Sequence, residues 1–475
     1  MMRPQLHLLL AQAATVSATL NKVVIISRHG ERERLNKDHL TGVEESGLGP
    51  PLTLQGLVHV GGTGAALRAR YLSPACAATG TCLGGAIGAG SFSSSEVRAQ
   101  STQTARTLGT AEVLLDALLP PATRPTAAGV HYPLSIESRA DDTDYVLRGY
   151  ANHKCDAQAS RVAAWFESAP FRTKAAETIS LRTEVGAALW EWSQFQQARP
   201  DDAWLRDAAS SWLVDADAAV PMQEWTNAED FVATAEPGPV LSPARLSEAH
   251  ALAAWVEAGK FGPSAAGSLC GGALLAEVRA ELVAAAPPAP RLRYFSAHYP
   301  SMLCLLSSLG ISAQSGTAED LWLTEGLPAF GSVLVFERLE RAPPATDVAR
   351  LFYFAGANAS GDSPWRQLRL PCPGGECEVP AALLAATDAA AVEDAAAWCA
   401  ACGTTERLLQ CAALTLGSAR RHVDPWAVLG VVLLSLLLAG LVVLAAVCFL
   451  WRWRGTAGAG KAPSASRSQP VVRQL

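Results

Sequence analysis

Lys22-Val23-Val24-Ile25-Ile26-Ser27, followed at once by Arg28-His29-Gly30-Glu31-Arg32, is the stretch of sequence that decides the fold. Its first six residues form a short β-branched run in which polar and apolar side chains do not alternate. Such a run is typical of a strand that is buried on both faces, as in parallel sheets. Side chains that directly follow a core strand lie at the sheet edge where α/β proteins place their functional sites.

A second stretch of this kind lies much later in the chain. Leu292 to Ala297 (Leu-Arg-Tyr-Phe-Ser-Ala) predicts another core strand, and His298 follows it directly. Two histidines, His29 and His298, are therefore expected at the carboxyl ends of buried strands. The other elements that the patterns predict are helices over 57–71 and 102–119, a helical insertion over about 137–290, and later strands over 332–337 and 349–354.

The motif after the first strand has the chemistry of a phosphate site. Arg28 and Arg32 flank His29 on a turn that contains Gly30. Guanidinium groups bind phosphate oxygens bidentately and keep their charge. A histidine held against that phosphate is able to attack phosphorus as a nucleophile. Because the arginines counter the charge on the transferred group, no metal or other cofactor is required.

The sequence resembles the histidine acid phosphatases, the branch that includes prostatic and lysosomal acid phosphatases and fungal phytases. The match covers about Lys22 to Cys411 and departs from the signature at Arg34, where the family usually has a proline. The segments that carry the resemblance are Arg28-His29-Gly30-Glu31-Arg32, Pro51 to Gly56 with Leu67 to Tyr71, Glu96-Val97-Arg98 leading to Arg106-Thr107, Gly271 to Leu274, and Leu370-Pro371-Cys372 to Cys377.

This resemblance implies residue roles and assembly. It implies a third phosphate-binding arginine, for which Arg98 is the first candidate and Arg106 the lesser one, and a supporting role for His298. It also implies an acidic pH optimum for activity and a homodimer. Apart from the resemblance, the sequence shows no sign of a dimer.

One departure from the family concerns the proton donor. Family members usually have His-Asp after the second catalytic strand, and the aspartate protonates the leaving oxygen. Here His298 is followed by Tyr299 and Pro300. A phenol with a pKa of about 10 is a poor general acid in acidic medium, and a positioned acid contributes about 10²–10⁴-fold. Phenolic esters are expected to suffer least from the loss.

Two further readings of the site remain open. The chain is either a phosphatase with a weakened acid step or a catalytically impaired relative that binds phosphorylated ligands at the cell surface or in endosomes. The sequence offers no positive support for a phytase-like enzyme, because the net charge of −6 is mild and no strongly basic run is present that could line a pocket. The same charge distribution shows no basic stripe, which argues against a nucleic-acid partner.

Both ends of the 475-residue chain have membrane-related patterns. Residues 1–18 resemble a secretory signal, with Arg3 before an apolar stretch and small residues at Val16-Ser17-Ala18. Trp426 to Trp451 contains no charged residue and is long enough to span a bilayer as a helix. A tail of residues 452–475 follows. These patterns predict a single-pass type I membrane protein of the plasma membrane, endosome or lysosome, with the catalytic domain lumenal or extracellular.

Cysteine usage agrees with export. Of eleven cysteines, Cys448 lies within the predicted span, which leaves ten outside it, an even number that suits an oxidising compartment. Cys76/Cys82 and Cys372/Cys377 are close enough to form local loops, and Trp398 to Cys402 is read as structural rather than redox-active. Asn358-Ala359-Ser360 is a glycosylation sequon.

We therefore expect a three-layer α/β core with a mostly helical cap inserted, of histidine-phosphatase type, plus one C-terminal transmembrane helix. The expected boundaries are a signal peptide at 1–18, a phosphatase domain at 19–411 (core 20–136 and 290–370, cap 137–289), a stem at 412–425, the span at 426–451 and the tail at 452–475. The expected activity is hydrolysis of small phosphomonoesters through phosphohistidine, with His29 and His298 catalytic and Arg28, Arg32 and Arg98 binding the phosphate.

Overall fold

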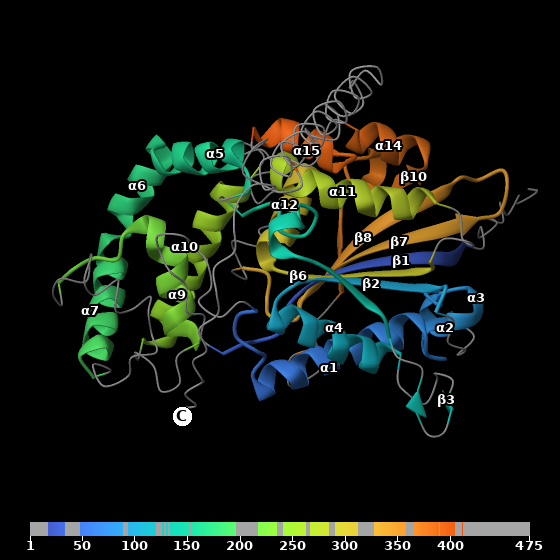
Figure 1. The fold of residues 1–475 in the computed structure, drawn as a ribbon, viewed down its shortest axis with the longest axis horizontal. Coiled ribbons are helices and arrows are strands. Elements are labelled where there is room, and N and C mark those ends of the chain that lie inside the picture. Colours follow the sequence, from blue (N-terminus) through green and yellow to red (C-terminus); the bar gives the residue numbers. More distant parts are fainter. Residues whose placement is uncertain are drawn as a thin grey trace, which may run out of the picture. The chain divides into compact units, whose positions relative to one another are not determined.

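A mixed sheet forms the centre of the protein (Figure 1). The computed structural model describes residues 18–33, 48–88, 94–119, 126–127, 130–131, 134–151, 154–195, 217–234, 241–262, 267–284, 290–311, 327–357, 365–388, 390–403 and 411. Its eight strands run in the order β10-β8-β7-β1-β6-β2-β5, and β9 pairs with β8. Their bounds are β1 Ala18–Arg28, β2 Val97–Thr102, β5 Ile136–Arg139, β6 Leu292–Ala297, β7 Val333–Arg341, β8 Asp347–Phe354, β9 Trp365–Leu368 and β10 Cys377–Val379.

The two predicted core strands are neighbours at the middle of this sheet. β1 pairs in parallel with β6, so that Arg28 lies opposite Ala297 and the two following histidines leave the same edge. β2 pairs in parallel with the other side of β6. On its second side β1 pairs antiparallel with β7. The side chains of Val23 to Ile26 are fully buried, as the unbroken apolar run predicts.

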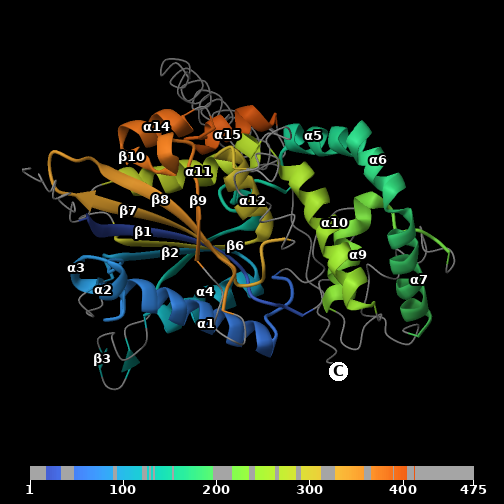
Figure 2. The same cartoon turned by 180° about the vertical axis from the view of Figure 1, so that it is seen from behind.

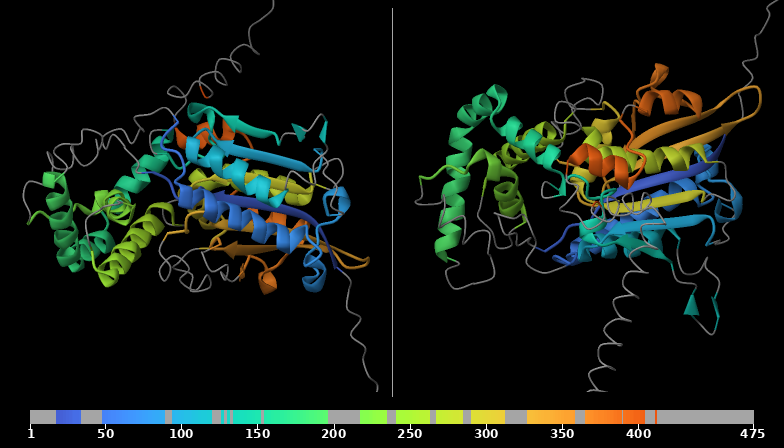
Figure 3. Two further views of the ribbon diagram at one scale, coloured as in Figure 1. Left: turned by 90° about the horizontal axis from the view of Figure 1, so that it is seen from below. Right: turned by 45° about the horizontal axis from the view of Figure 1, so that its top comes forward.

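Helices cover both faces of the sheet. Figures 1 and 2 show α1 and α4 on one face and α11 and α12 on the other, and Figure 3 shows α1 and α4 side by side. Apolar side chains of β1 divide between the two cores, with Val23 and Ile25 facing α1 and α4, and Val24 and Ile26 facing α11 and α12. The helices on the two faces are α1 Leu54–Tyr71, α4 Ala105–Leu118, α11 Gly267–Val283 and α12 Tyr299–Ser308. The prediction of an α/β fold is confirmed.

Further helices lie in the sequence between β5 and β6, and we call α5, α6, α7, α9 and α10 the cap. These helices have a hydrophobic core of their own around the buried side chains of Leu189, Trp225 and Val256. Their bounds are α5 Asp156–Phe166, α6 Ala169–Glu177, α7 Ile179–Phe195, α9 Trp225–Thr234 and α10 Pro243–Phe261. The remaining elements are α2 Cys76–Thr79, α3 Gly85–Gly88, the pair β3 Thr126–Ala127 and β4 Val130–His131, α14 Ala381–Thr387 and α15 Ala395–Cys402.

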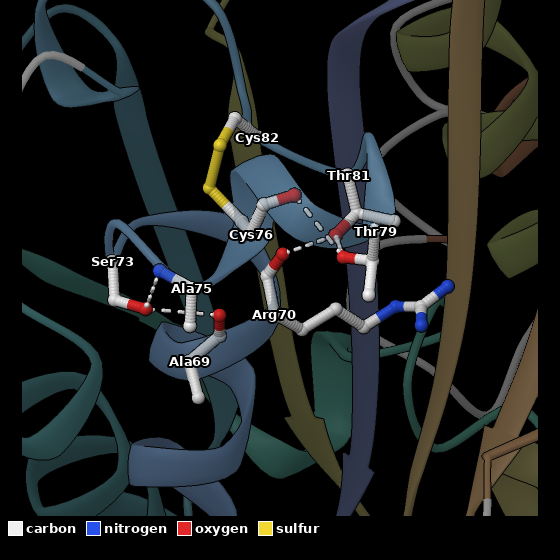
Figure 4. The surroundings of a disulfide bond; sticks show 8 residues. All are labelled: Ala69, Arg70, Ser73, Ala75, Cys76, Thr79, Thr81 and Cys82. Atoms are coloured by element: carbon white, nitrogen blue, oxygen red, sulfur yellow. Dashed lines mark hydrogen bonds between the residues drawn. A yellow bond between two sulfur atoms is a disulfide. The ribbon is translucent and has the colours of Figure 1, made fainter.

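The ten cysteines outside the predicted span form five disulfides. Two close the local loops that the sequence predicts, Cys76–Cys82 and Cys372–Cys377. The two cysteines near Trp398 bind different partners, in Cys155–Cys402 and Cys399–Cys411, which confirms their structural role; the fifth bond is Cys270–Cys304. Figure 4 shows the first loop, where the Thr81 hydroxyl donates a hydrogen bond to the Arg70 carbonyl at the end of α1.

The membrane-related predictions lie almost entirely outside the described residues. The structure does not describe residues 1–17, the sequon at 358–360 or residues 412–475, which contain the predicted span. In the part of the chain that it does describe, no helix is both long and apolar enough to cross a membrane.

Candidate active site

His29 stands at the carboxyl end of β1 with its tautomer fixed by the backbone. Its Nδ1 lies 2.8 Å from the carbonyl oxygen of Gly30. Because a carbonyl only accepts, the neutral ring carries its proton on Nδ1, and Nε2 keeps the lone pair. Burial lowers the pKa of His29 well below its usual value, and the positive charges of Arg106, Arg28 and Arg32 lower it further. His29 is therefore neutral and nucleophilic at Nε2 well into the acidic range.

A close approach between the motif and α1 explains the glycine of the motif. A Cβ on Gly30 would meet Val60 Cγ2 at 2.6 Å and the Gly56 carbonyl oxygen at 2.9 Å. Thr53 caps α1 by accepting from the Gly56 amide, and the same hydroxyl donates to the Glu31 carboxylate at 2.9 Å. Glu31 thus fastens the turn to the helix, and glycine lets the two backbones meet.

Three buried guanidinium groups act on His29, those of Arg28, Arg32 and Arg106. Arg28 donates from Nη1 to the Pro328 carbonyl at 2.5 Å and stacks 3.7 Å from the centre of the Phe330 ring. The Nε atoms of Arg28 and Arg32 are buried and have no hydrogen-bond partner among the described residues. Buried donors of this kind beside a nucleophile suit an anion with several oxygens.

The structure does not bring Arg98, the first candidate for the third phosphate-binding arginine, into this cluster, and Arg106, the lesser candidate, lies there instead. Arg98 lies at the start of β2, about half exposed, and donates from Nε and Nη2 to the Glu137 carboxylate at 3.1 and 3.0 Å. The site is at the other end of that strand, four residues or about 13 Å away. Arg106 lies in the first turn of α4, which follows β2 at the edge where His29 emerges.

His298 lies beside His29. The two rings meet edge to face with centroids 5.3 Å apart. His298 Nε2 is 3.1 Å from the Thr102 hydroxyl at the end of β2, and the ring of Tyr150 packs against it. The structure therefore brings together four of the five predicted site residues, namely His29, His298, Arg28 and Arg32.

Tyr299 begins α12, with Pro300 in the first turn, where proline is readily accommodated. Its hydroxyl donates to Glu257 Oε2 at 3.2 Å, and its ring centre is 5.1 Å from the Arg28 guanidinium carbon. Burial, and after it the charge of Glu257, raises the pKa of Tyr299 well above its usual value. The phenol at this position is thus a hydrogen-bond donor to a carboxylate and an even weaker acid than a phenol in water.

Helix α9 of the cap brings two carboxylates that no sequence pattern indicated. Both oxygens of Asp230 accept from Arg32 Nη2, at 3.0 and 2.9 Å. The neighbouring Glu229 is buried and pairs with His250 Nδ1. Burial raises the pKa of Glu229, while the hydrogen bond from His250 opposes the rise. These cap residues act on the same arginines that surround His29, since the charges of Asp230 and Glu229 both reach Arg28.

Comparisons with known proteins show likeness at the level of structure. No family model and no curated protein matches the sequence. The phytase from Hafnia alvei in complex with myo-inositol hexakis sulphate aligns with a TM-score of 0.52 at 16% identity, over 79% of this chain and 98% of that one. The phytase from Citrobacter braakii gives the same values. The phytase from Klebsiella sp. ASR1 gives 0.50 at 17% identity, over 79% and 95%. Because phytases belong to the histidine acid phosphatase family, this chain has the histidine acid phosphatase fold.

Proposed function

We propose that the protein is an acid phosphatase that hydrolyses small phosphomonoesters through a phosphohistidine intermediate. The arrangement of His29 carries this proposal: its Nδ1 faces a carbonyl oxygen, so that Nε2 is the nucleophilic atom. Burial, and after it the charges of the three arginines, lowers the pKa of His29 and keeps the imidazole neutral in acidic medium. The fold likeness to phytases supports a phosphoric monoester hydrolase.

The reaction follows from the charges around the histidine. Arg28, Arg32 and Arg106 hold the phosphoryl oxygens, and Nε2 of His29 attacks phosphorus as the ester P–O bond breaks. The guanidinium groups counter the charge that builds up on the equatorial oxygens. His298, beside His29, donates a hydrogen bond to one of these oxygens when it is protonated. Water then attacks the phosphohistidine, which releases phosphate and restores His29.

The test is turnover by the full-length protein at acidic pH, with p-nitrophenyl phosphate and glycerol 2-phosphate as substrates. His29→Ala is expected to lower kcat by about 10⁴-fold or more, because the nucleophile is removed. His59→Ala is a matched control, since His59 is a partly exposed residue of α1 whose Nε2 contacts Gln55. Full retention of turnover in His29→Ala, or its loss in both variants, would contradict the proposal. A folded protein that binds phosphate but turns over neither ester would favour a binding role.

We also propose that the protein is an exported type I membrane protein anchored by residues 426–451. Five disulfides outside that segment support export, since such bonds persist in oxidising compartments. In cells that glycosylate proteins, removal of N-glycans is expected to shift the wild type in electrophoresis and to leave Asn358→Gln unshifted. A wild type that is unglycosylated and extracted without detergent would count against this topology.

A further inference from the structure

The position that normally holds the acid in this fold lacks a carboxylate, although carboxylates surround it. Tyr299 follows His298 there, with its ring beside the Arg28 guanidinium and its hydroxyl bound to Glu257. After burial and Glu257, the charge of Asp230 also raises the pKa of Tyr299. Asp230, although distant in sequence, therefore lies close to the place of the missing acid.

The three carboxylates around this place differ in how they are held. Glu257 is fully buried and accepts from the Thr226 hydroxyl at 2.8 Å, the Lys260 ammonium at 2.8 Å and the Tyr299 hydroxyl. Glu229 is buried against His250. The oxygens of Glu257 are thus occupied by three donors, and Glu229 is paired with a histidine of the cap, so that neither carboxylate contacts the arginines around His29.

Asp230 is the carboxylate that binds one of the arginines proposed to hold the phosphate. Its side chain is 26% exposed, and its two oxygens receive hydrogen bonds from Arg32 Nη2. Arg32 is one of the guanidinium groups that surround His29, and its Nε is buried without a partner in the described part of the chain. A phosphate on Arg32 would therefore lie directly beside Asp230. The two anions compete for the arginine, and their repulsion favours the protonated form of Asp230.

We propose that Asp230, supplied by the cap, is the proton donor that replaces the missing aspartate. As the P–O bond breaks and the bond from His29 Nε2 to phosphorus forms, the carboxyl proton of Asp230 passes to the ester oxygen, and a neutral alcohol leaves. The Asp230 carboxylate then takes a proton from the water that attacks the phosphohistidine. Phosphate is released, and both groups return to their starting state. This inference rests on the proposed phosphatase function.

The test compares two leaving groups in Asp230→Asn, which keeps the size of the side chain and removes the proton. The measured quantity is kcat/KM, because it reports the steps up to phosphoryl transfer and not the later hydrolysis of the phosphohistidine. For glycerol 2-phosphate we expect a fall of about 10²–10³-fold, within the range for a positioned acid. For p-nitrophenyl phosphate, whose oxygen leaves with little protonation, we expect a fall of less than about 10-fold. Asp230→Glu, which restores the acid, is expected to recover part of the lost turnover of the alkyl ester.

Glu224→Gln is the matched control, because Glu224 precedes α9 and accepts a hydrogen bond from Asn227 rather than from an arginine of the site. It should leave both kcat/KM values unchanged. Equal losses on the two esters in Asp230→Asn would overturn the proposal and make Asp230 a positioning residue for Arg32. Unchanged or faster turnover of glycerol 2-phosphate would also overturn it and mean that Asp230 only occupies the phosphate position. If the wild type turned over neither ester, the proposed function itself would fail. Thermal unfolding of each variant shows whether it is folded.

Discussion

The sheet edge and helix α9 both contribute side chains to the candidate site, and the charges that they contribute are of opposite sign. The sheet edge carries His29 among three guanidinium groups, those of Arg28, Arg32 and Arg106. Helix α9 carries Glu229 and Asp230, and Asp230 binds Arg32. In the proposed reaction, the cations on the core side bind the phosphoryl group, which is the same in every substrate, and the cap side meets the leaving group, which varies. The proposal thus assigns phosphate binding to one region and proton supply and leaving-group preference to the other.

The comparison also bears on how large an anion the site accepts. A phosphorylated ring with many further phosphates would bring those groups against the cap, where Glu229 and Asp230 lie, and like charges repel. The described cap residues near Arg28 and Arg32 are thus better suited to substrates with one phosphate on a neutral leaving group. This agrees with the small phosphomonoesters proposed here.

Replacing arginines one at a time is the strongest test of the claim that the core side holds the phosphate. Arg106→Ala is expected to lower kcat/KM for p-nitrophenyl phosphate by about 10²–10³-fold, because a buried guanidinium beside His29 is lost. Arg98→Ala is the matched control. It removes only a half-exposed ion pair with Glu137, and the change should be less than about 2-fold. Steady-state kinetics at acidic pH measures both.

The opposite result would contradict the claim that the phosphate binds at the carboxyl ends of the parallel strands. If Arg98→Ala lost activity and Arg106→Ala did not, the phosphate would have to bind at the opposite end of β2 from His298. Equal and modest losses would mean that neither arginine touches phosphate and that Arg28 and Arg32 suffice.

A smaller effect is expected in the pH profile. Burial and the charges of Arg106, Arg28 and Arg32 lower the pKa of His29, so its neutral form persists well below pH 6.5, and activity that needs this form persists with it. Arg106→Gln removes one positive charge, which raises the pKa of His29. The acidic limb of the profile of kcat/KM against pH should then move to higher pH.

Glu224→Gln, at a residue that accepts a hydrogen bond from Asn227 of the cap, should leave the acidic limb in place. A limb that stays fixed in Arg106→Gln would show that the group titrating there is not His29. A limb that moves downward would contradict the sign of the interaction between Arg106 and His29.

The core half of the site was predictable because local sequence determines it. The unbroken apolar run Val23 to Ile26 predicts β1, and the mainly apolar run Leu292 to Ala297 predicts β6. Residues directly after parallel strands meet at one edge, which places His29 and His298 together. The same rule would have favoured Arg106 over Arg98, since β2 ends at Thr102 and Arg106 follows it. The strand itself was not predicted, because Val97-Arg98-Ala99-Gln100-Ser101-Thr102 has only two apolar residues, Val97 and Ala99.

The cap half could not be predicted, for a different physical reason. Asp230 reaches Arg32 across 198 residues, and its position depends on how α9 packs within the cap around Trp225. Nothing in the pattern of an amphipathic helix says which polar residue of its outer face meets another part of the chain. Charged residues on a helix are usually solvated, so Glu229 and Asp230 carried no signal of their own.

The central place of β1 has a consequence for how the chain is made. This strand is complete by residue 28, and the two strands that flank it lie at residues 292–297 and 333–341. At about 5–20 residues per second, a ribosome needs roughly 15–50 s to reach the first of them. Throughout that interval the run Val23 to Ile26 has no sheet to join and is prone to aggregate. The cap helices emerge in the meantime and can begin to form their own core. We therefore expect chaperones that cover the first strand until the sheet can close to increase the yield of folded protein.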